Sequence, residues 1–255
     1  MILKLNNQEY FDTSKPIDIS LSLHDGDDAV RAWYCDPIKL EPVITDRFIG
    51  DVNLGGAVNF RNLFMNPHAN GTHTECVGHI SKEFYSINQC LNEFHFKACV
   101  ISVQPIEKKV NAETDLVITK SALEKACETF KNDVKNCEVL IIRSLPNTSE
   151  KLTKNYSNTN PTYFEKEAIT YVNDLGVDHL MVDLPSIDRE EDGGELIGHH
   201  VFWDYPANPQ SHKTITELIF VPNSVKDNIY ICNIQITSLE NDASPSKILL
   251  FEIQS

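Results

Sequence analysis

One stretch in the second half of the chain constrains the fold most, because its pattern is strand, helix, strand. Val139–Ile142 is a continuous apolar run, which is typical of a strand covered on both faces. Thr162–Leu175 is predicted to be a helix, since Thr162 and Glu165 match a capping box and Gly176 follows as a C-terminal glycine. A second strand is expected at His179–Asp183. A helix between two such strands predicts a parallel pair with a crossover, and therefore an α/β fold.

The rest of the chain is predicted to be rich in β structure. Thr119 is expected to cap a helix over Lys120–Phe130, and a short helix is expected over Ile80–Leu91. The further predicted strands are Ile17–Leu23, Phe96–Val103, Ile215–Val221, Asn228–Thr237 and Lys247–Ile253. Loops and short strands are expected over 24–66, and loops over 188–194 and 204–210. Because no repeat, linker or low-complexity tract interrupts this order, residues 1–255 are expected to form a single domain.

Charge limits the partners that the surface can bind. The net charge is -15 and the isoelectric point is near 4.9. Such an acidic surface repels the phosphates of nucleic acids and of anionic membranes, so neither is an expected partner. A small molecule that enters a pocket is not excluded, because local charges dominate there.

Two features predict a soluble, cytoplasmic protein. The first residues lack a basic start and a long apolar run, and no later window approaches the roughly 18 apolar residues of a membrane helix. The seven cysteines are an odd number without a C-x-x-C pair, which fits reduced thiols better than disulfides.

The segment from His68 to His79 carries the clearest chemical signal, with three histidines, an acid and a thiol in twelve residues. His73 and Glu75 are two apart, so on an extended segment both side chains project from one face. Gly71 gives the backbone the freedom to turn His68 toward the same point. Imidazole and carboxylate are preferred ligands of zinc-like ions, and a metal-activated water attacks near neutral pH, so a hydrolase is indicated. His79 is either another ligand or an acid/base group beside the metal.

A second group of ligand-type residues lies far along the chain. His199 and His200 follow a predicted loop, and Glu217 lies on a predicted strand. They could converge on the first cluster, although Glu217 alone could be a solvated strand residue. Asp183 and Asp188 flank a turn, where hydrogen bonds to the backbone are their default role.

Other side chains near these segments have alternative interpretations. Cys76 could be a nucleophile with His73 or His79 as its base, but a small buried hydrophobic role is the more common one. Four aromatic side chains could wall a pocket, although core packing is the more common role: Tyr34, Phe60, Phe64 and Trp203.

The order of these pieces resembles the cyclase-like metal-dependent hydrolases, which include bacterial kynurenine formamidase and isatin hydrolase. The segment from His68 to His79 is similar to the family signature H-x-G-T-H-x-D-x-P-x-H. Asp18-Ile19-Ser20 resembles its early D-I-S, and Arg143-Ser144 lies where the family has R-T. The turn from Asp183 to Asp188 is similar to D-x-P-S-x-D, so the resemblance spans most of the chain.

The resemblance implies a swivelling β/β/α fold, with a mixed central sheet and outer helices. It implies that His68, His73 and Glu75 hold one metal ion, and that Glu75, His199 and Glu217 hold a second, with Glu75 bridging. His200 is the alternative to His199, and His79 would be the acid/base residue. This chain departs from the signature in three ways: Glu75 replaces aspartate, Val77 replaces proline, and one extra residue separates His68 from Gly71.

The activity that the resemblance implies is hydrolysis of a carbon–nitrogen amide bond, as in an arylformamidase of tryptophan catabolism acting on N-formylkynurenine. The alternatives are hydrolysis of a lactam, as in isatin hydrolase, and a non-catalytic protein that binds metal or a small ligand. The implied cofactor is zinc or manganese, as one or two ions, and no organic cofactor is expected. A homodimer or higher homo-oligomer is the implied assembly.

Overall fold

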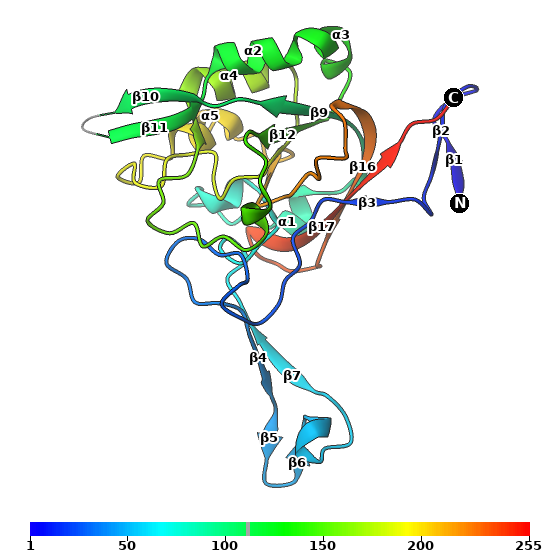
Figure 1. Ribbon diagram of the computed structural model, residues 1–255, viewed down its shortest axis with the longest axis vertical. Coiled ribbons are helices and arrows are strands. Elements are labelled where there is room, and N and C mark those ends of the chain that lie inside the picture. The colour runs from blue at the N-terminus through cyan, green and yellow to red at the C-terminus, as the bar shows by residue number, and fades with distance from the viewer. Residues whose placement is uncertain (111–112) are drawn as a thin grey trace.

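The computed structural model describes residues 1–110 and 113–255, and its centre is a mixed β-sheet (Figure 1). Among these residues eight strands pair in the order β16-β9-β12-β14-β15-β8-β17-β3. Their bounds are β3 Ile17–Asp18, β8 His73–Glu75, β9 His95–Val103, β12 Val139–Ser144, β14 His179–Val182, β15 Thr214–Glu217, β16 Asn228–Ile236 and β17 Ala243–Glu252. Because β17 pairs with β8 at one end and with β16 along the rest, the sheet closes on itself like a barrel.

The two strands of the predicted crossover unit are parallel neighbours, as expected. β12 pairs in parallel with β14 on one side and β9 on the other, and β14 pairs in parallel with β15. The other pairings of this sheet are antiparallel. The α/β class, with a mixed central sheet and outer helices, is therefore confirmed.

The core has two main parts, one on each face of the sheet. Leu140 and Ile142 of β12 pack with the helices over 120–127, 166–174 and 197–203, whereas Val139 and Ile141 pack inside the closed sheet. All six residues of β12 are buried, which confirms a strand covered on both faces. Each such side chain contributes about 1.5–3 kcal/mol of burial free energy, so this run anchors both layers.

The outer helices lie mainly over one face of the sheet (Figure 1). They are α1 Ile87–Cys90, α2 Lys120–Cys127, α3 Lys131–Val134, α4 Lys166–Asp174 and α5 Ile197–Trp203. The predicted cap of α2 is confirmed, because Thr119 accepts a hydrogen bond from the N–H of Ala122 at 3.2 Å. A 3-10 turn, Glu128–Phe130, continues α2 to the predicted end.

The predicted capping box of α4 is wrong. Tyr163–Phe164 forms the short strand β13, which pairs in parallel with β11 (Glu113–Ile118), and Glu165 is itself the residue that precedes the helix. The carboxylate of Glu165 accepts from the N–H of Lys120 and from the Lys108 ammonium, so it is not available to the start of its own helix. Gly176 has φ +80 directly after the helix, which confirms its C-terminal role.

Other boundaries differ from the predictions. The helix expected over 80–91 is reduced to α1, after the 3-10 turn Val77–His79, and the strand expected over 17–23 is reduced to β3 and a bridge from Ser20 to Ile219. β15 ends at Glu217 because Leu218 adopts φ +54. The hairpin of β10 Ile106–Val110 and β11 Glu113–Ile118 was not predicted. Residues 188–194 and 204–210 are loops, as expected.

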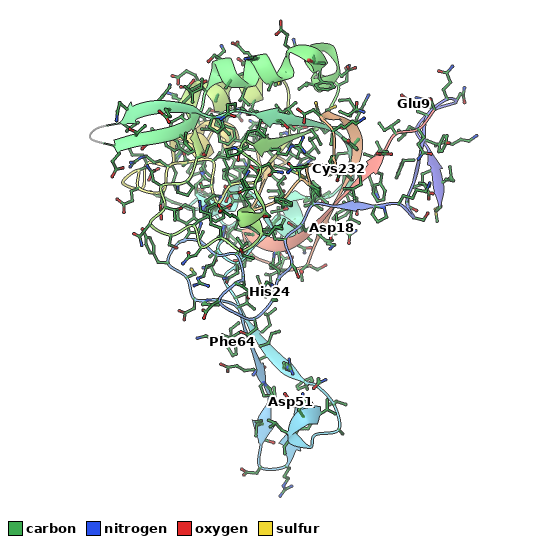
Figure 2. All side chains as sticks on the ribbon, in the orientation of Figure 1. Glu9, Asp18, His24, Asp51, Phe64 and Cys232 are labelled. Carbon is green, nitrogen blue, oxygen red and sulfur yellow. The ribbon has the colours of Figure 1, made fainter. Side chains whose placement is uncertain are left out.

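Residues 39–64, which we call the arm, project from the body as a narrow β-structure (Figure 1). The arm contains β4 Lys39–Pro42, β5 Ile44–Thr45, β6 Phe48–Ile49, the 3-10 turn Val52–Leu54 and β7 Arg61–Phe64. Figure 2 labels Phe64 at its base and Asp51 in its outer half. The prediction of loops and short strands in this region is confirmed.

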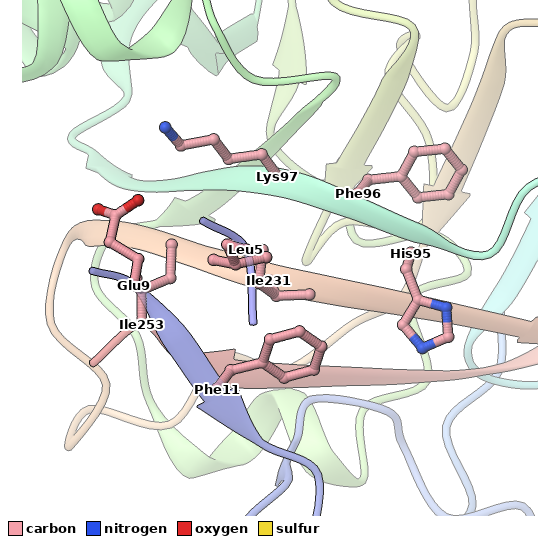
Figure 3. Close-up of a pocket in the computed structure, with 8 residues that line it drawn as sticks. All are labelled: Leu5, Glu9, Phe11, His95, Phe96, Lys97, Ile231 and Ile253. Atoms are coloured by element: carbon pink, nitrogen blue, oxygen red, sulfur yellow. The ribbon is translucent and has the colours of Figure 1, made fainter. Parts of the chain in front are cut away.

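A second, smaller hairpin carries the N-terminus, formed by β1 Ile2–Lys4 and β2 Tyr10–Asp12. Between it and the sheet lies a surface pocket of about 300 Å³, with an apolar floor that includes Phe11 and Ile231 and with Glu9 and Lys97 at its edge (Figure 3). None of the predicted site residues lines this pocket. Within the described residues, no helix is long and apolar enough to span a bilayer.

Candidate metal centre

The sheet itself presents the middle of the histidine segment. β8 is antiparallel to both β15 and β17, so His73 lies opposite Glu217 and Glu75 lies opposite Ile215. His73 and Glu75 are both buried on this three-residue strand. Gly71 precedes it with φ +90, and a Cβ there would lie 2.4 Å from Leu23 Cδ2, so glycine is needed at this turn.

The carboxylate of Glu75 is the centre of the cluster and is only 1% exposed. Its Oε2 lies 2.9 Å from His68 Nδ1 and 3.9 Å from His79 Nδ1, and its Oε1 lies 3.2 Å from His199 Nε2. Two sets of possible metal donors follow, in each of which the donor atoms lie within 4.8 Å of one another. One set is His68, Glu75 and His79, and the other is His73, Glu75 and Glu217.

All five predicted ligands and the predicted acid/base residue therefore meet in one place, but their grouping differs in part from the expected one. Glu75 belongs to both sets, as a bridging carboxylate would. His79 accompanies His68 where His73 was expected, and His199 lies 3.9 Å from Glu217, outside either set. The role of each residue stays a prediction.

Of the adjacent pair on α5, only His199 faces the cluster. His200 lies with Nδ1 2.9 Å from the carbonyl oxygen of Tyr205, at the end of the helix. Successive helical residues point about 100° apart, so one helix cannot present both rings to the same point. The geometry therefore favours His199 over His200.

Each of three histidines has one ring nitrogen held by a fixed partner and the other turned toward a carboxylate. His73 Nδ1 lies 3.0 Å from the Gly71 carbonyl, His199 Nδ1 lies 2.6 Å from Asp188, and His68 Nε2 lies 2.7 Å from Asp242. Such partners fix the tautomer and orientation of a ligating histidine. This arrangement is typical of metal-binding histidines.

The two aspartates of the turn after β14 bind backbone, as expected. Both carboxylate oxygens of Asp183 accept from the N–H of Ser144 at 3.0 Å, and the Lys151 ammonium donates to Oδ2 at 2.7 Å. Asp188 accepts from the N–H groups of Gly198 and His199 and, in addition, orients the His199 ring. Asp188 thus connects the turn to the cluster.

The electrostatics of the cluster favour positive charge. Burial opposes ionisation of Glu75, but the neighbouring His79 and His199 hold its pKa well below the usual range. Burial opposes protonation of His199, yet Asp188 and Glu75 raise its pKa to about 10. Burial and the adjacent Glu75 charge raise the pKa of Glu217. A divalent cation would satisfy the same carboxylates that here retain protons on histidines.

The Nε2 atom of His73 has the surroundings expected of a metal ligand. His73 is 0% exposed, and its Nε2 has no hydrogen-bond partner, although Glu217 Oε2 lies 3.5 Å away. A buried polar atom without a partner costs roughly 1–3 kcal/mol, and a ligated ion would remove that cost. The residues present therefore fit a divalent metal.

The cluster opens into a cavity of about 390 Å³, a size suited to a small molecule. His68, His79, His199 and Glu217 form the wall that the cavity shares with the cluster. Its other lining residues are Trp33, Asn66, Ser186, Arg189, Glu190, Asp192 and Leu196. The guanidinium of Arg189 is bonded to Asp115 and Glu113, so it is a structural part of the wall.

The predicted aromatic wall is not formed by the four expected residues. Tyr34 is exposed, Phe60 and Phe64 lie on the arm, and Trp203 is buried behind His199 with ring centroids 5.5 Å apart. The cavity is lined instead by Trp33, which no sequence pattern singled out. Asp242 was missed as well, because it lies in no motif and 174 residues after His68.

The structure favours the structural interpretation of Cys76. Its side chain is fully buried within the apolar core cluster, and its thiol donates toward the Tyr85 carbonyl at 3.6 Å. The neighbouring Cys90 and burial raise the pKa of the Cys76 thiol, which disfavours the nucleophilic thiolate. All seven cysteines, which lie in the described residues, are free.

The chain matches the model of a known protein family. Residues 17–189 match the family model described as "Putative cyclase", and the chain belongs to this cyclase family. No curated protein matches the chain.

Several solved structures share the fold at low sequence identity. An isatin hydrolase bound to the product analogue thioisatinate is 13% identical, with a TM-score of 0.63, and the alignment covers 93% of this chain and 92% of that one. Isatin hydrolase A from Ralstonia solanacearum is 13% identical, with a TM-score of 0.64 and coverage of 93% and 91%. A "predicted metal-dependent hydrolase" from Bacillus stearothermophilus is 15% identical, with a TM-score of 0.60 and coverage of 93% and 98%.

Proposed function

We propose that this protein is a metal-dependent amidohydrolase that cleaves a carbon–nitrogen amide bond in a small substrate. The observation that carries the proposal is the buried carboxylate of Glu75, shared by two donor sets at the wall of a small-molecule cavity. The fold shared with metal-dependent hydrolases supports it.

His68, His73, Glu75, His199 and Glu217 would hold the metal, as one or two ions. Nitrogen and carboxylate donors suit zinc best and also accept manganese. When bound, such an ion polarises a carbonyl group and lowers the pKa of water. Glu75 keeps the histidines directed at one point, and Asp188 keeps the His199 ring from rotating.

His79 is the proposed proton carrier. It lines the cavity, and its Nδ1 lies 3.4 Å from Asp242 and 3.9 Å from Glu75. A half-buried imidazole beside two carboxylates can take up a proton and release it to the departing nitrogen. A protein that only binds metal or a small ligand needs no such group, so His79 favours catalysis over that alternative.

The proposed substrate is an aryl formamide such as N-formylkynurenine, which would place the reaction in tryptophan breakdown. Trp33 offers an aromatic face in the cavity, and planar rings stack on such faces. The second candidate is a lactam, because two of the structures with this fold are isatin hydrolases.

The free cysteines support a cytoplasmic location.

The test has two stages. Untagged protein, purified without chelator, is analysed for metal by elemental analysis and titrated with zinc and manganese; binding of less than one ion per chain would refute the metal centre. Metal-loaded protein is then assayed against formyl-anilides, N-formylkynurenine, isatin and other lactams. Turnover of formyl-anilides would support the aryl formamide as substrate, and turnover of lactams would support the second candidate. If no compound is hydrolysed, the alternative of a non-catalytic protein that binds metal or a small ligand is favoured.

We also propose a homodimer that associates through the arm. Only Gly50 is buried within residues 39–64, and ten large apolar side chains of the arm are exposed: Leu40, Ile44, Phe48, Ile49, Val52, Leu54, Val58, Phe60, Leu63 and Phe64. A stable interface takes about 20–30 residues from each partner, which the arm alone supplies. An isolated hairpin is marginally stable in water, so a surface of this kind needs a partner.

Charge supports a second copy as that partner. Two chains of net charge -15 repel each other, but the arm carries three basic and three acidic side chains and no net charge: Lys39, Arg47, Arg61, Glu41, Asp46 and Asp51. The arm is therefore a part of the molecule that a second copy can approach without that repulsion. A two-fold interface would use both arms.

A further inference from the structure

We infer that Asp242 is a positioning residue of the metal centre, which holds His68 so that its Nδ1 faces Glu75. The inference rests on the proposed metal-dependent function and deepens it, because it gives this chain an anchor that its signature segment lacks. That segment carries one residue more between His68 and Gly71 than the family pattern has. With this longer connection to Gly71, the backbone alone holds the His68 ring less firmly than the shorter connection of the family pattern would.

The contacts of the Asp242 carboxylate meet this need. Oδ2 of Asp242 lies 2.7 Å from His68 Nε2 and 3.4 Å from His79 Nδ1. The two imidazole rings stack with centroids 4.2 Å apart. One carboxylate oxygen thus spans both rings, while the other nitrogen of His68 is left facing Glu75 at 2.9 Å.

The sheet fixes the place of Asp242. In the pairing of β17 with β8, Ala243 lies opposite Glu75, so the preceding residue lies beside Cys76. The N–H of Cys76 donates to the Asp242 carbonyl at 3.0 Å, and the N–H of Ile87 donates to the Asn241 carbonyl at 2.8 Å. The backbone at Asp242 is therefore held by the residue that follows Glu75, and the backbone before it by the first residue of α1.

Gly78 shows how closely the two segments pass. A Cβ at this glycine would lie 2.3 Å from the Tyr85 carbonyl oxygen and 3.1 Å from Asp242 Cβ. Since the first contact is with backbone, a side chain here would force the turn that carries His79 to shift. Glycine at this position lets the carboxylate reach both histidines.

His68 needs a side-chain anchor more than the other two histidines with fixed partners. His73 lies on β8 and His199 on α5, and both are almost fully buried. His68 lies in the turn after the arm, and its side chain is 21% exposed. Asp188 orients His199, and Asp242 is its counterpart for His68.

The experiment measures zinc affinity by titration calorimetry for the full chain and for Asp242→Ala and Asp242→Asn. Loss of a carboxylate that orients a ligating histidine typically weakens metal binding about 10–100-fold, and we expect a loss of this size for Asp242→Ala. Asp242→Asn retains the shape and an acceptor oxygen, so it should weaken binding less and serves as the second variant if alanine impairs folding. Glu240→Gln is the matched control, because this exposed carboxylate lies in the same connection and accepts hydrogen bonds from Asn88 and Gln89 rather than from the cluster.

A double-variant comparison distinguishes positioning from direct ligation. In a His68→Asn chain, Asp242→Ala should weaken zinc binding no further, because the carboxylate acts through His68. A further loss of tenfold or more in that background would overturn the inference. NMR gives a second readout: the Nε2 proton of His68, held by Asp242, should exchange slowly with water in the natural chain and faster in Asp242→Ala.

The outcomes also separate this inference from the proposed function. If the natural chain binds no zinc, the metal proposal fails, and the exchange rate of the His68 Nε2 proton in the metal-free protein still tests the anchor. If the natural chain binds zinc and Asp242→Ala binds it equally well, the metal proposal stands and the role of Asp242 is refuted.

Discussion

The metal centre and the arm depart from the usual distribution of side chains in opposite directions. At the centre, ionisable side chains are buried: Glu75, Glu217, His73 and His199 are at most 3% exposed. On the arm, apolar side chains are in water: Phe60 is 59% exposed and Phe64 is 51% exposed. The two regions are only a few residues apart along the chain, since the arm ends at Phe64 and the signature begins at His68.

Neither departure stabilises the isolated chain. Burying a charge costs several kcal/mol unless it is paired, and exposed apolar surface gains nothing until it is covered. Each region is therefore explained by the partner that we propose for it, a divalent cation at the centre and a second copy at the arm. In this molecule the candidate site and the proposed interface share one property: each has a free-energy cost that no contact within the isolated chain offsets.

The largest expected effect comes from removing the shared charge of the centre. Glu75→Gln keeps the shape of the side chain but not the charge that draws His68, His79 and His199 together. Loss of a residue that only orients a metal ligand weakens metal binding by up to roughly 100-fold. Glu75→Gln should weaken zinc binding by more than this, and turnover should be lost. Calorimetry and elemental analysis measure this, with Glu240→Gln as the control. Unchanged zinc affinity would show that the buried charge serves stability instead.

His79→Ala separates binding from catalysis within the same cluster. A general acid/base contributes about 10²–10⁴-fold to turnover, so kcat should fall by that factor while the protein keeps its metal. The measurement is kcat with the substrate found in the panel, together with metal content. A variant that retains both its metal and full turnover would remove His79 from the mechanism.

Changes on the arm test the other half of the comparison. Leu54→Ser with Phe60→Ser should raise the dimer dissociation constant at least about 100-fold, because a two-fold interface loses each contact twice. Sedimentation velocity measures this, and thermal stability of the monomer should hold, since neither side chain is buried. Phe84→Ser, at an exposed site on the body, is the control. A monomeric natural chain would refute the arm as an interface.

Sequence patterns predicted those parts of the two regions whose causes are local. The β12 run and the Thr119 cap were predictable because neighbouring residues decide them. The capping box failed because Lys120 and Lys108, from elsewhere in the chain, bind the Glu165 carboxylate. The arm was predicted as loops and short strands, but its projection and its exposed apolar surface depend on the body from which it extends.

The candidate site shows the same limit. The short spacing from His68 to His79, together with the family resemblance, predicted which residues meet. Asp242 could not be found in this way, because the register of β17 against β8 sets its position. Trp33 could not be found either, since its place in the cavity follows from a turn in which Trp33 and Tyr34 both have positive φ, an unusual conformation for aromatic residues.

The smallest expected effect concerns Cys76, which lies next to the charged centre yet belongs to the apolar core. Cys76→Ser should leave kcat within about twofold, because a buried thiol with a raised pKa is a poor nucleophile. Its cost should appear in stability instead, as roughly 1–3 kcal/mol for a hydroxyl placed among Ile87, Leu91 and other apolar side chains. Urea unfolding and a turnover assay measure the two effects separately. Loss of turnover with unchanged stability and metal content would favour covalent catalysis by the thiol. Cys76 would then belong to the charged centre and not to the apolar core.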